Sequence, residues 1–318
     1  MMWYSASKPI TTVAILQLWE RGLLRLDDPV ANFIDGWDAG KERCTIRHVL
    51  THTGGFSMPG EDPFDANLTY AEAIALIAAH PAEHPPGTQA AYHPSTGWKV
   101  LGAIVKSVTG RPIDLYVREH IFEPLAMTSC HMGISLEEQP AIESRLTPIA
   151  WKGYAIPNFE NGSLQMVEYR MDQIHNEPWH IAKIEPGGNM RGPARELGRF
   201  YESLLGFGPP VIEQRTVEVM IAAHRMGMPD RTYLNQTFPW GLGVEISTKI
   251  PGRPGRRAFG HGGMASSRGL ADPDCGLVIA FVTNGLPNPL AHEQRVSSVI
   301  DAVYDALGDD VAQLRLVR

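Results

Sequence analysis

A serine and a lysine near the start of the chain have the spacing of a nucleophile and its neighbouring base. Ser5 and Lys8 stand three positions apart, before a run in which Ile10, Val13 and Leu18 recur at helical intervals. Residues three apart on a helix face the same side. A buried lysine with a lowered pKa can take the proton of a serine hydroxyl and make the oxygen nucleophilic. Taken alone, a Ser-x-x-Lys tetrapeptide more often has a structural role, in which Ser5 caps the helix and Lys8 is solvated.

The neighbouring residues predict where this helix begins and ends. Pro9 is tolerated only in the first turn, so the helix should begin near Ser5 to Ser7, with Gly22 as its stop. Its apolar positions predict one buried stripe. The N–H groups of the first turn would point toward an oxyanion formed at Ser5.

Composition excludes several function classes. The chain has 318 residues, 43% hydrophobic and 20% charged, enough for a large core in one or two domains. A net charge of -7 without a basic cluster argues against nucleic acid, and no apolar run is long enough for a membrane span. Cys44, Cys130 and Cys275 are distant and odd in number, which predicts free thiols and a cytoplasmic location, unless a signal segment lies upstream.

Periodicity divides the chain into a helical middle and a strand-rich end. Helical patterns cover 70–79, 98–108, 114–121, 195–205, 212–223 and 292–307, and strand patterns cover 241–247, 256–259, 267–271 and 276–283. Residues 128–190 have no sustained period and are interpreted as irregular. We expect an α/β (α+β) fold: residues 1–30 and 236–318 form an antiparallel sheet flanked by helices, and residues 31–235 form an all-helical inserted domain.

Five motifs in order give a family resemblance over nearly the whole chain. They are Tyr4-Ser5-Ala6-Ser7-Lys8-Pro9, Leu26-Asp27-Asp28-Pro29-Val30, the stretch from Thr45 to Phe56, Pro86-Gly87-Thr88 before Tyr92, and Phe259-Gly260-His261-Gly262-Gly263. Together they resemble class C β-lactamase-like serine hydrolases, a group that includes family VIII carboxylesterases and penicillin-binding-protein-like DD-peptidases. Correlated motifs in order are far more specific than a single Ser-x-x-Lys pair.

The resemblance implies roles for three residues. Ser5 matches the nucleophile that accepts the acyl group, Lys8 its partner, and Tyr92 the tyrosine that exchanges a proton with Ser5 and the leaving group. A tyrosine has an ordinary pKa of about 10, so it ionises at neutral pH only beside a cation such as Lys8. Which of the two is the base stays open.

The third motif implies an oxyanion site and a substrate preference. On its strand, Gly262 and Gly263 let the substrate approach the backbone, and the Met264 N–H joins that of Ser5 as an oxyanion donor. Family β-lactamases usually have lysine where this chain has His261. A mostly neutral imidazole recognises a carboxylate less well, which favours simple esters over β-lactams and peptides.

Two departures from the family pattern qualify this interpretation. In Tyr92-His93-Pro94-Ser95, Pro94 replaces the amide that usually grips the acyl-amino group, and Ser95 is a partial substitute. Only four residues precede Ser5, whereas family members carry two more strands there. Three alternatives follow for the apolar strand 276–283, which would otherwise present an open edge: the true start lies upstream, another copy covers the edge in a homo-oligomer, or the protein is unstable.

The sequence therefore predicts an enzyme, a serine hydrolase that acts through a Ser5 acyl-enzyme on small or medium carboxylic esters. A D-amino-acid peptidase or amidase and a β-lactamase are the alternatives within the family, and a non-catalytic binding or assembly protein is the rival from another class. No cofactor is expected. No metal is expected either, because the pairs His48/His52 and His80/His84 lack a third ligand.

Overall fold

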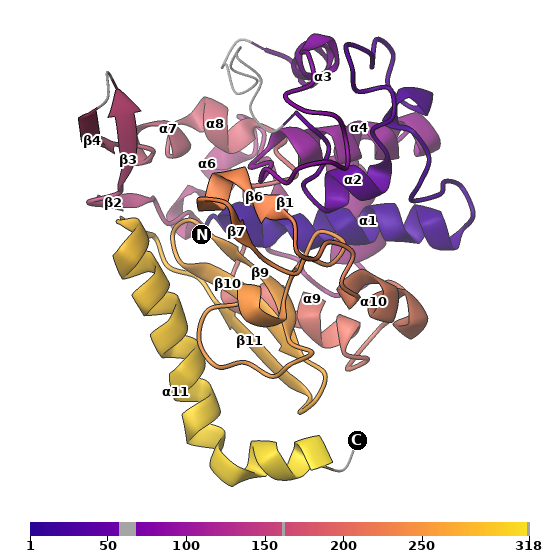
Figure 1. The fold of residues 1–318 in the computed structure, drawn as a ribbon. Helices are drawn as coiled ribbons and strands as arrows, with labels where there is room; N and C mark the ends of the chain where they lie inside the picture. The colour runs from indigo at the N-terminus through magenta and orange to yellow at the C-terminus, as the bar shows by residue number, and fades with distance from the viewer. Residues whose placement is uncertain (57–67, 161–162, 317–318) are drawn as a thin grey trace.

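A four-stranded antiparallel sheet lies beneath a layer of helices (Figure 1). The computed structural model describes residues 1–56, 68–160 and 163–316. The strand order is β11-β10-β9-β8, with β8 at Glu245–Ile246, β9 at Phe259–Gly263, β10 at Ser267–Asp272 and β11 at Leu277–Phe281. The strand patterns thus predict this sheet in the right part of the chain, although β9 begins later than expected and carries the third motif.

The first helix is buried on all sides. A short 3-10 turn, η1 (Tyr4–Ser7), leads into α1 (Lys8–Glu20), and Gly22 follows with a φ of 69°. Every residue from Met2 to Leu18 is buried except Ser5, so the predicted single buried stripe is wrong. The reason is that α1 contacts both β9 of the sheet and helices α4 (Thr96–Thr109) and α5 (Ile113–Val117).

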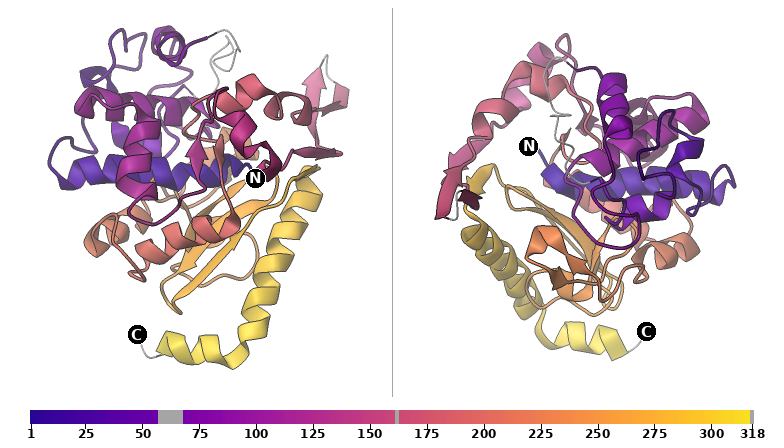
Figure 2. Two further views of the ribbon diagram at one scale, coloured as in Figure 1. Left: turned by 180° about the vertical axis from the view of Figure 1, so that it is seen from behind. Right: turned by 45° about the horizontal axis from the view of Figure 1, so that its top comes forward.

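The middle of the chain is mostly helical but also contains short strands. Residues expected to be irregular form a hairpin of β3 (Ala155–Glu160) and β4 (Ser163–Glu168), which lies at the periphery (Figures 1 and 2). The strand β2 (Ala150–Lys152) pairs in parallel with β12 (Gly285–Pro287). The expected all-helical insertion is therefore helical only in part. The sequence analysis misses the pairing of β2 with β12 because pairing across more than 130 positions leaves no local signal.

The remaining elements are short except for four helices. They are η2 (Val30–Asn32), α2 (Ile46–Leu50), α3 (Tyr70–Ala79), η3 (Arg118–Phe122), β1 (His131–Met132), α6 (Gln139–Ile142), η4 (Glu143–Arg145), α7 (Asp172–His175), α8 (Pro178–Ala182), β5 (Met190–Arg191), α9 (Ala194–Leu204), α10 (Gln214–Ile221), β6 (Pro229–Asp230), η5 (Arg231–Tyr233), β7 (Gln236–Thr237), η6 (Ser247–Lys249) and α11 (Pro289–Leu316). The helix α4 ends at Gly110, which adopts the left-handed conformation common at helix ends.

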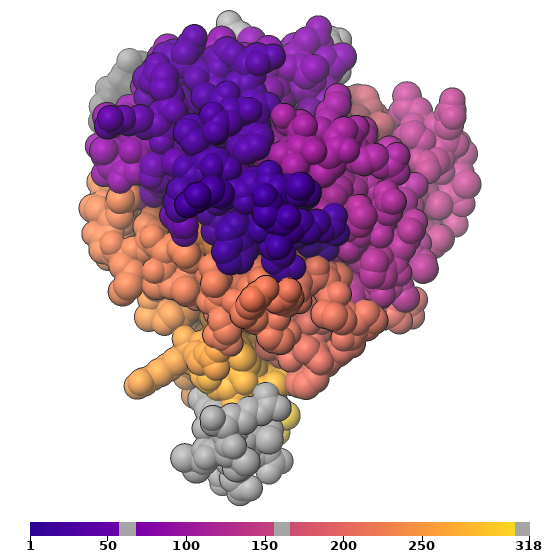
Figure 3. All heavy atoms as spheres, turned by 90° about the vertical axis from the view of Figure 1, so that its right-hand side faces the viewer, coloured from indigo at the N-terminus to yellow at the C-terminus, as the bar shows by residue number. Residues whose placement is uncertain are grey.

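Helices cover both faces of the sheet. The helix α9 packs on β10 and β11, and α11 packs its Val296 and Ile300 against Leu270 and Ile279 from the other face. Both chain ends join one body, in which N-terminal atoms lie directly against residues from the second half of the chain (Figure 3). The division at residues 30 and 236 stays a prediction, although α9 lies within the range assigned to the helical part and packs on the sheet.

The strand β11 lies at the end of the sheet and, among the described residues, pairs with β10 alone. Its five residues are buried only at Ile279 and otherwise half-buried. Association of two copies through this edge stays a prediction. No helix in the described ranges is both long and apolar enough to cross a membrane.

Candidate active site

The side-chain nitrogen of Lys8 is held between three oxygens deep in the protein. Its Nζ lies 3.1 Å from Ser5 Oγ, 2.6 Å from the Pro94 carbonyl oxygen and 2.8 Å from that of Gly187. The indole of Trp98 lies beneath Nζ, with 4.9 Å to the ring centre, and donates a hydrogen bond of 2.9 Å to the Lys8 carbonyl. Lys8 is therefore fixed at both its backbone and its side-chain end.

This environment favours the neutral amine. Burial lowers the pKa of Lys8 to about 7, and the negative charge of Glu185 partly opposes this shift. Carbonyl oxygens only accept hydrogen bonds, so a neutral amine at this position donates its two N–H groups to Pro94 and Gly187. Its lone pair then faces Ser5 Oγ, which is the geometry needed to accept the serine proton.

The backbone around Ser5 is held in an uncommon conformation. Tyr4 has a φ of 50°, in the left-handed region that non-glycine residues rarely adopt. Two contacts stabilise it: Ser7 Oγ donates a hydrogen bond of 2.6 Å to the Tyr4 carbonyl, and Ser267 Oγ donates one to that of Trp3. Strain of this kind is retained where the surrounding structure fixes it. As a result, Ser5 is the partly exposed residue in a buried segment.

Tyr92 lies beside both residues. It is hydrogen-bonded to Ser5, and Lys8 Nζ lies 5.2 Å from the centre of its ring. Burial raises the pKa of Tyr92 above its ordinary value, and the hydrogen bond with Ser5 only partly opposes the rise. Tyr92 is therefore a neutral hydroxyl at neutral pH.

His52 holds the segment that carries Tyr92, a role that the sequence analysis misses. Its carbonyl accepts a hydrogen bond of 3.0 Å from Ala91 N–H, and its Nδ1 accepts one of 3.0 Å from His93 N–H. Its ring lies 4.5 Å from that of Tyr92, centre to centre. Burial lowers the pKa of both His52 and His93, so both rings are neutral. The motif from Thr45 to Phe56 contains His52 but does not reveal these contacts.

His261 lies in the middle of β9, paired with Gly269 of β10. Its Nδ1 lies 2.8 Å from the Gly262 carbonyl oxygen, so Nδ1 carries the proton and Nε2 is the acceptor. Burial lowers the pKa of His261 to about 4, consistent with the expectation that the imidazole is neutral at pH 7. Within the described residues, Nε2 has no hydrogen-bond partner.

A cavity of about 500 Å³ joins these residues. Its wall includes Ser5, Tyr92, His261, Gly262, Gly263 and Met264, so most of the predicted site residues lie around one space. Lys8 lies behind Ser5, as its complete burial requires. Ser95 differs: it is buried at the start of α4 and is not among the described residues that line the cavity.

Two buried ion pairs flank the site, and neither has a sequence signal because the partners are distant in the chain. Glu245 and Arg268 pair on the cavity wall. Burial opposes ionisation of Glu245 most strongly, but the charges of Arg268 and its other neighbours, Lys249 among them, together outweigh burial and lower the pKa of Glu245 to about 2. Glu185 pairs with Lys99 behind Lys8. These pairs set the electrostatic environment on both sides of Ser5.

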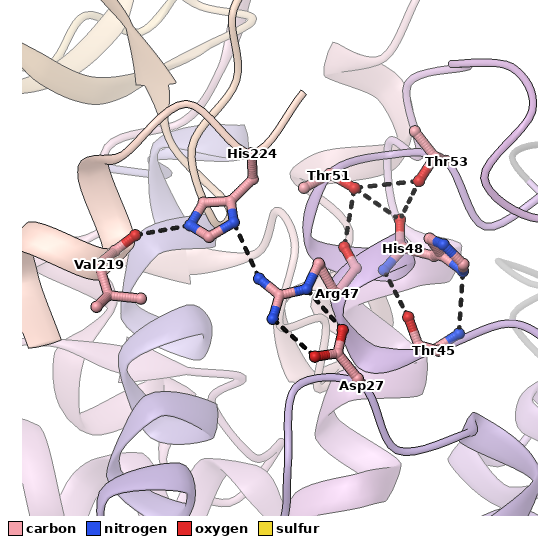
Figure 4. Close-up of polar contacts among 8 residues, drawn as sticks. All are labelled: Asp27, Thr45, Arg47, His48, Thr51, Thr53, Val219 and His224. Atoms are coloured by element: carbon pink, nitrogen blue, oxygen red, sulfur yellow. Dashed lines mark hydrogen bonds and ion pairs between the residues drawn. The ribbon is translucent and has the colours of Figure 1, made fainter. Parts of the chain in front are cut away.

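Two of the four histidines considered as metal ligands, His48 and His52, have structural partners. His48 forms a capping box at the start of α2: its N–H donates to Thr45 Oγ1, and its Nδ1 accepts from Thr45 N–H (Figure 4). The adjacent Arg47 pairs with Asp27 and contacts His224 (Figure 4). Both His48 and His52 are thus engaged with the backbone.

Comparisons with known proteins identify the family of the chain. A family model described as Beta-lactamase matches residues 1–302. "Esterase/beta-lactamase LipL" of Mycobacterium tuberculosis is 28% identical, covering 99% of this chain and 75% of its own length, and "Esterase EstB" of Burkholderia gladioli is 32% identical, covering 94% and 81%. The solved structure of a penicillin-binding protein homologue from Caulobacter crescentus matches with a TM-score of 0.76 and 28% identity, covering 96% of this chain and 83% of its own. This chain therefore belongs to the β-lactamase family of serine hydrolases.

Proposed function

We propose that the protein is a carboxylesterase that hydrolyses small or medium esters through an acyl-enzyme on Ser5. The observation that carries the proposal is the position of Lys8 Nζ, 3.1 Å from Ser5 Oγ, with both other hydrogen-bonding directions taken by carbonyl oxygens. Because neutral Lys8 presents its lone pair to Ser5, Lys8 is the base, and neutral Tyr92 is the proton donor.

The first step forms the acyl-enzyme. Lys8 Nζ takes the Ser5 proton while Ser5 Oγ attacks the ester carbonyl carbon, and the N–H groups of Ser5 and Met264 stabilise the oxyanion. When the bond to the leaving alcohol breaks, Tyr92 gives its proton to the departing oxygen and is reprotonated from cationic Lys8. Water then attacks the acyl carbon by the same route in reverse, releasing the acid and restoring Ser5.

Ester substrates are favoured over β-lactams by two features. The neutral His261 offers no cation at the position of the usual family lysine, and Pro94 uses its carbonyl to hold Lys8 instead of contacting an acyl-amino group. The names of the relatives LipL and EstB both include esterase activity. The second candidate, a peptidase or amidase acting on D-amino-acid substrates, is supported by the names of two relatives in Escherichia coli, each called "Putative D-alanyl-D-alanine carboxypeptidase".

A fluorophosphonate probe and a pair of variants test this function. The probe should lose fluoride and form one phosphorus–oxygen bond, which peptide mapping should place on Ser5. Ser5→Ala should lose hydrolysis of p-nitrophenyl butyrate by several orders of magnitude, about 10⁶ in the best-studied case. Ser135→Ala, on the exposed surface, is the control and should keep full activity. Labelling at another serine, or a Ser5→Ala rate within tenfold of wild type, would overturn the assignment.

A further inference from the structure

A lysine on the wall of the active-site cavity has aromatic neighbours and, within the residues that the structure describes, no ion-pair partner. Lys249 ends η6, between β8 and β9, and lines the same cavity as Ser5. Its Nζ lies 3.6 Å from the ring centre of Tyr233 and 4.4 Å from that of Phe238. The two rings attract the ammonium but cannot accept its hydrogen bonds as an oxygen would.

The nearby carboxylates are engaged with other groups. Within the described part of the chain Lys249 forms no ion pair, because Glu245 pairs with Arg268 and Asp230 pairs with Arg225 at 3.1 Å. Burial lowers the pKa of Lys249, and Glu245 opposes that shift. An ammonium in this situation gains more from an incoming anion than a solvated one does.

The other titratable groups of the wall leave a positive charge at this end. Arg268 and Glu245 balance each other, and burial lowers the pKa of His292 to about 4, so that ring is neutral. Glu293 also lines the cavity, but its side chain is exposed to solvent, where its charge is screened. Among the described residues, Lys249 is therefore a cation of the cavity wall that no carboxylate pairs with directly.

We propose that Lys249 is a specificity-determining residue that binds a carboxylate carried by the ester substrate. Lys249 contacts the ring of Tyr233, and the centre of that ring lies 6.0 Å from the centre of the Tyr92 ring. A carboxylate bound to Lys249 would therefore be separated from the catalytic Tyr92 by the ring of Tyr233. The inference rests on the proposed esterase function. In this proposal the substrate carboxylate meets a cation on η6, because the position on β9 where family β-lactamases usually have lysine holds the neutral His261.

Matched esters that differ in one charge test the proposal on the acyl side. Monomethyl adipate carries a free carboxylate, and the N-methylamide of the same monoester has a neutral group of similar length. Wild type should favour the carboxylate, and Lys249→Met should lower the ratio of the two kcat/KM values by about tenfold to a hundredfold, the effect of one hydrogen bond to a charged group. Lys249→Arg should restore the ratio, since a guanidinium keeps the charge and stacks on aromatic rings.

A second pair separates the acyl side from the alcohol side. In 6-acetoxyhexanoate and its N-methylamide, the charge lies on the leaving alcohol, so the pair with the larger Lys249-dependent ratio identifies which half of the ester reaches η6. Lys106→Met, on the exposed face of α4, is the control for removal of a lysine charge. Equal ratios in wild type and Lys249→Met for both pairs, with ester hydrolysis retained, would overturn the inference alone. Loss of all Ser5-dependent hydrolysis in wild type would instead overturn the proposed function.

Discussion

The carboxylate of Glu185 should set the pH at which the enzyme becomes active. If neutral Lys8 is the base, kcat/KM rises with pH through the pKa of Lys8, which burial lowers to about 7. The neutral fraction of an amine with that pKa falls from about 0.9 at pH 8 to about 0.01 at pH 5, so kcat/KM should fall by about ninetyfold. Glu185 raises the pKa of Lys8, so Glu185→Gln should move the midpoint to lower pH and make the enzyme more active at pH 5 to 6.

The buried partner of Glu185 requires a second variant. Glu185→Gln leaves Lys99 without its carboxylate, and breaking a buried pair in this way costs about 3–5 kcal/mol of folding free energy. The double variant Lys99→Met/Glu185→Leu removes both charges and should therefore be more stable than Glu185→Gln. The pH midpoint of its kcat/KM should still lie below that of wild type. Glu137→Gln, on the exposed surface, is the matched control.

The assay is p-nitrophenyl butyrate hydrolysis from pH 5 to 9 at constant ionic strength, corrected for the spontaneous reaction. A kcat/KM that stays level between pH 6 and 8 would refute neutral Lys8 as the base. A midpoint that moves upward in both Glu185 variants would refute the electrostatic link between Glu185 and Lys8.

The other predictions concern the unit around Lys8 and the Glu245 pair. Lys8→Ala and Tyr92→Phe should each lose most of kcat, and the double variant little more, since members of one unit are non-additive; fully multiplicative losses would separate them. Gly187→Ala would place a Cβ 3.0 Å from Trp98 Cβ, 3.2 Å from the Pro94 carbonyl oxygen and 3.3 Å from Lys8 Nζ, so kcat should fall while KM changes little, and an unchanged kcat would show that these groups adjust. Arg268→Met should destabilise the fold in urea by about 3–5 kcal/mol, which Glu245→Leu in the same chain should largely restore. Because the pKa of Glu245 falls from 4.5 to about 2 on folding, its stabilising effect is complete above pH 4.5 and is lost toward pH 2; a urea midpoint that is constant over this range would contradict the pairing.

The sequence determines those parts of the site that depend on near neighbours. Ser5 and Lys8 meet because three residues make about one helical turn, and Pro9 and Gly22 limit the helix by their own backbone chemistry. The alternating strand patterns after residue 241 likewise predict the sheet, since side-chain direction in a strand repeats every two residues. Motif order adds the family, and with it Tyr92 and the third motif.

Tertiary structure alone decides the protonation state and surroundings of these groups. Pro94 and Gly187, which accept hydrogen bonds from Lys8, lie 86 and 179 positions away from it, so no local pattern predicts these contacts or the burial that lowers the pKa of Lys8. The same holds for Lys249, which meets the cavity only because η6 packs its side chain on Tyr233 and Phe238. A pKa depends on burial and on nearby charges, and both are properties of packing between distant segments, whereas helical and strand periodicity are properties of a few consecutive residues.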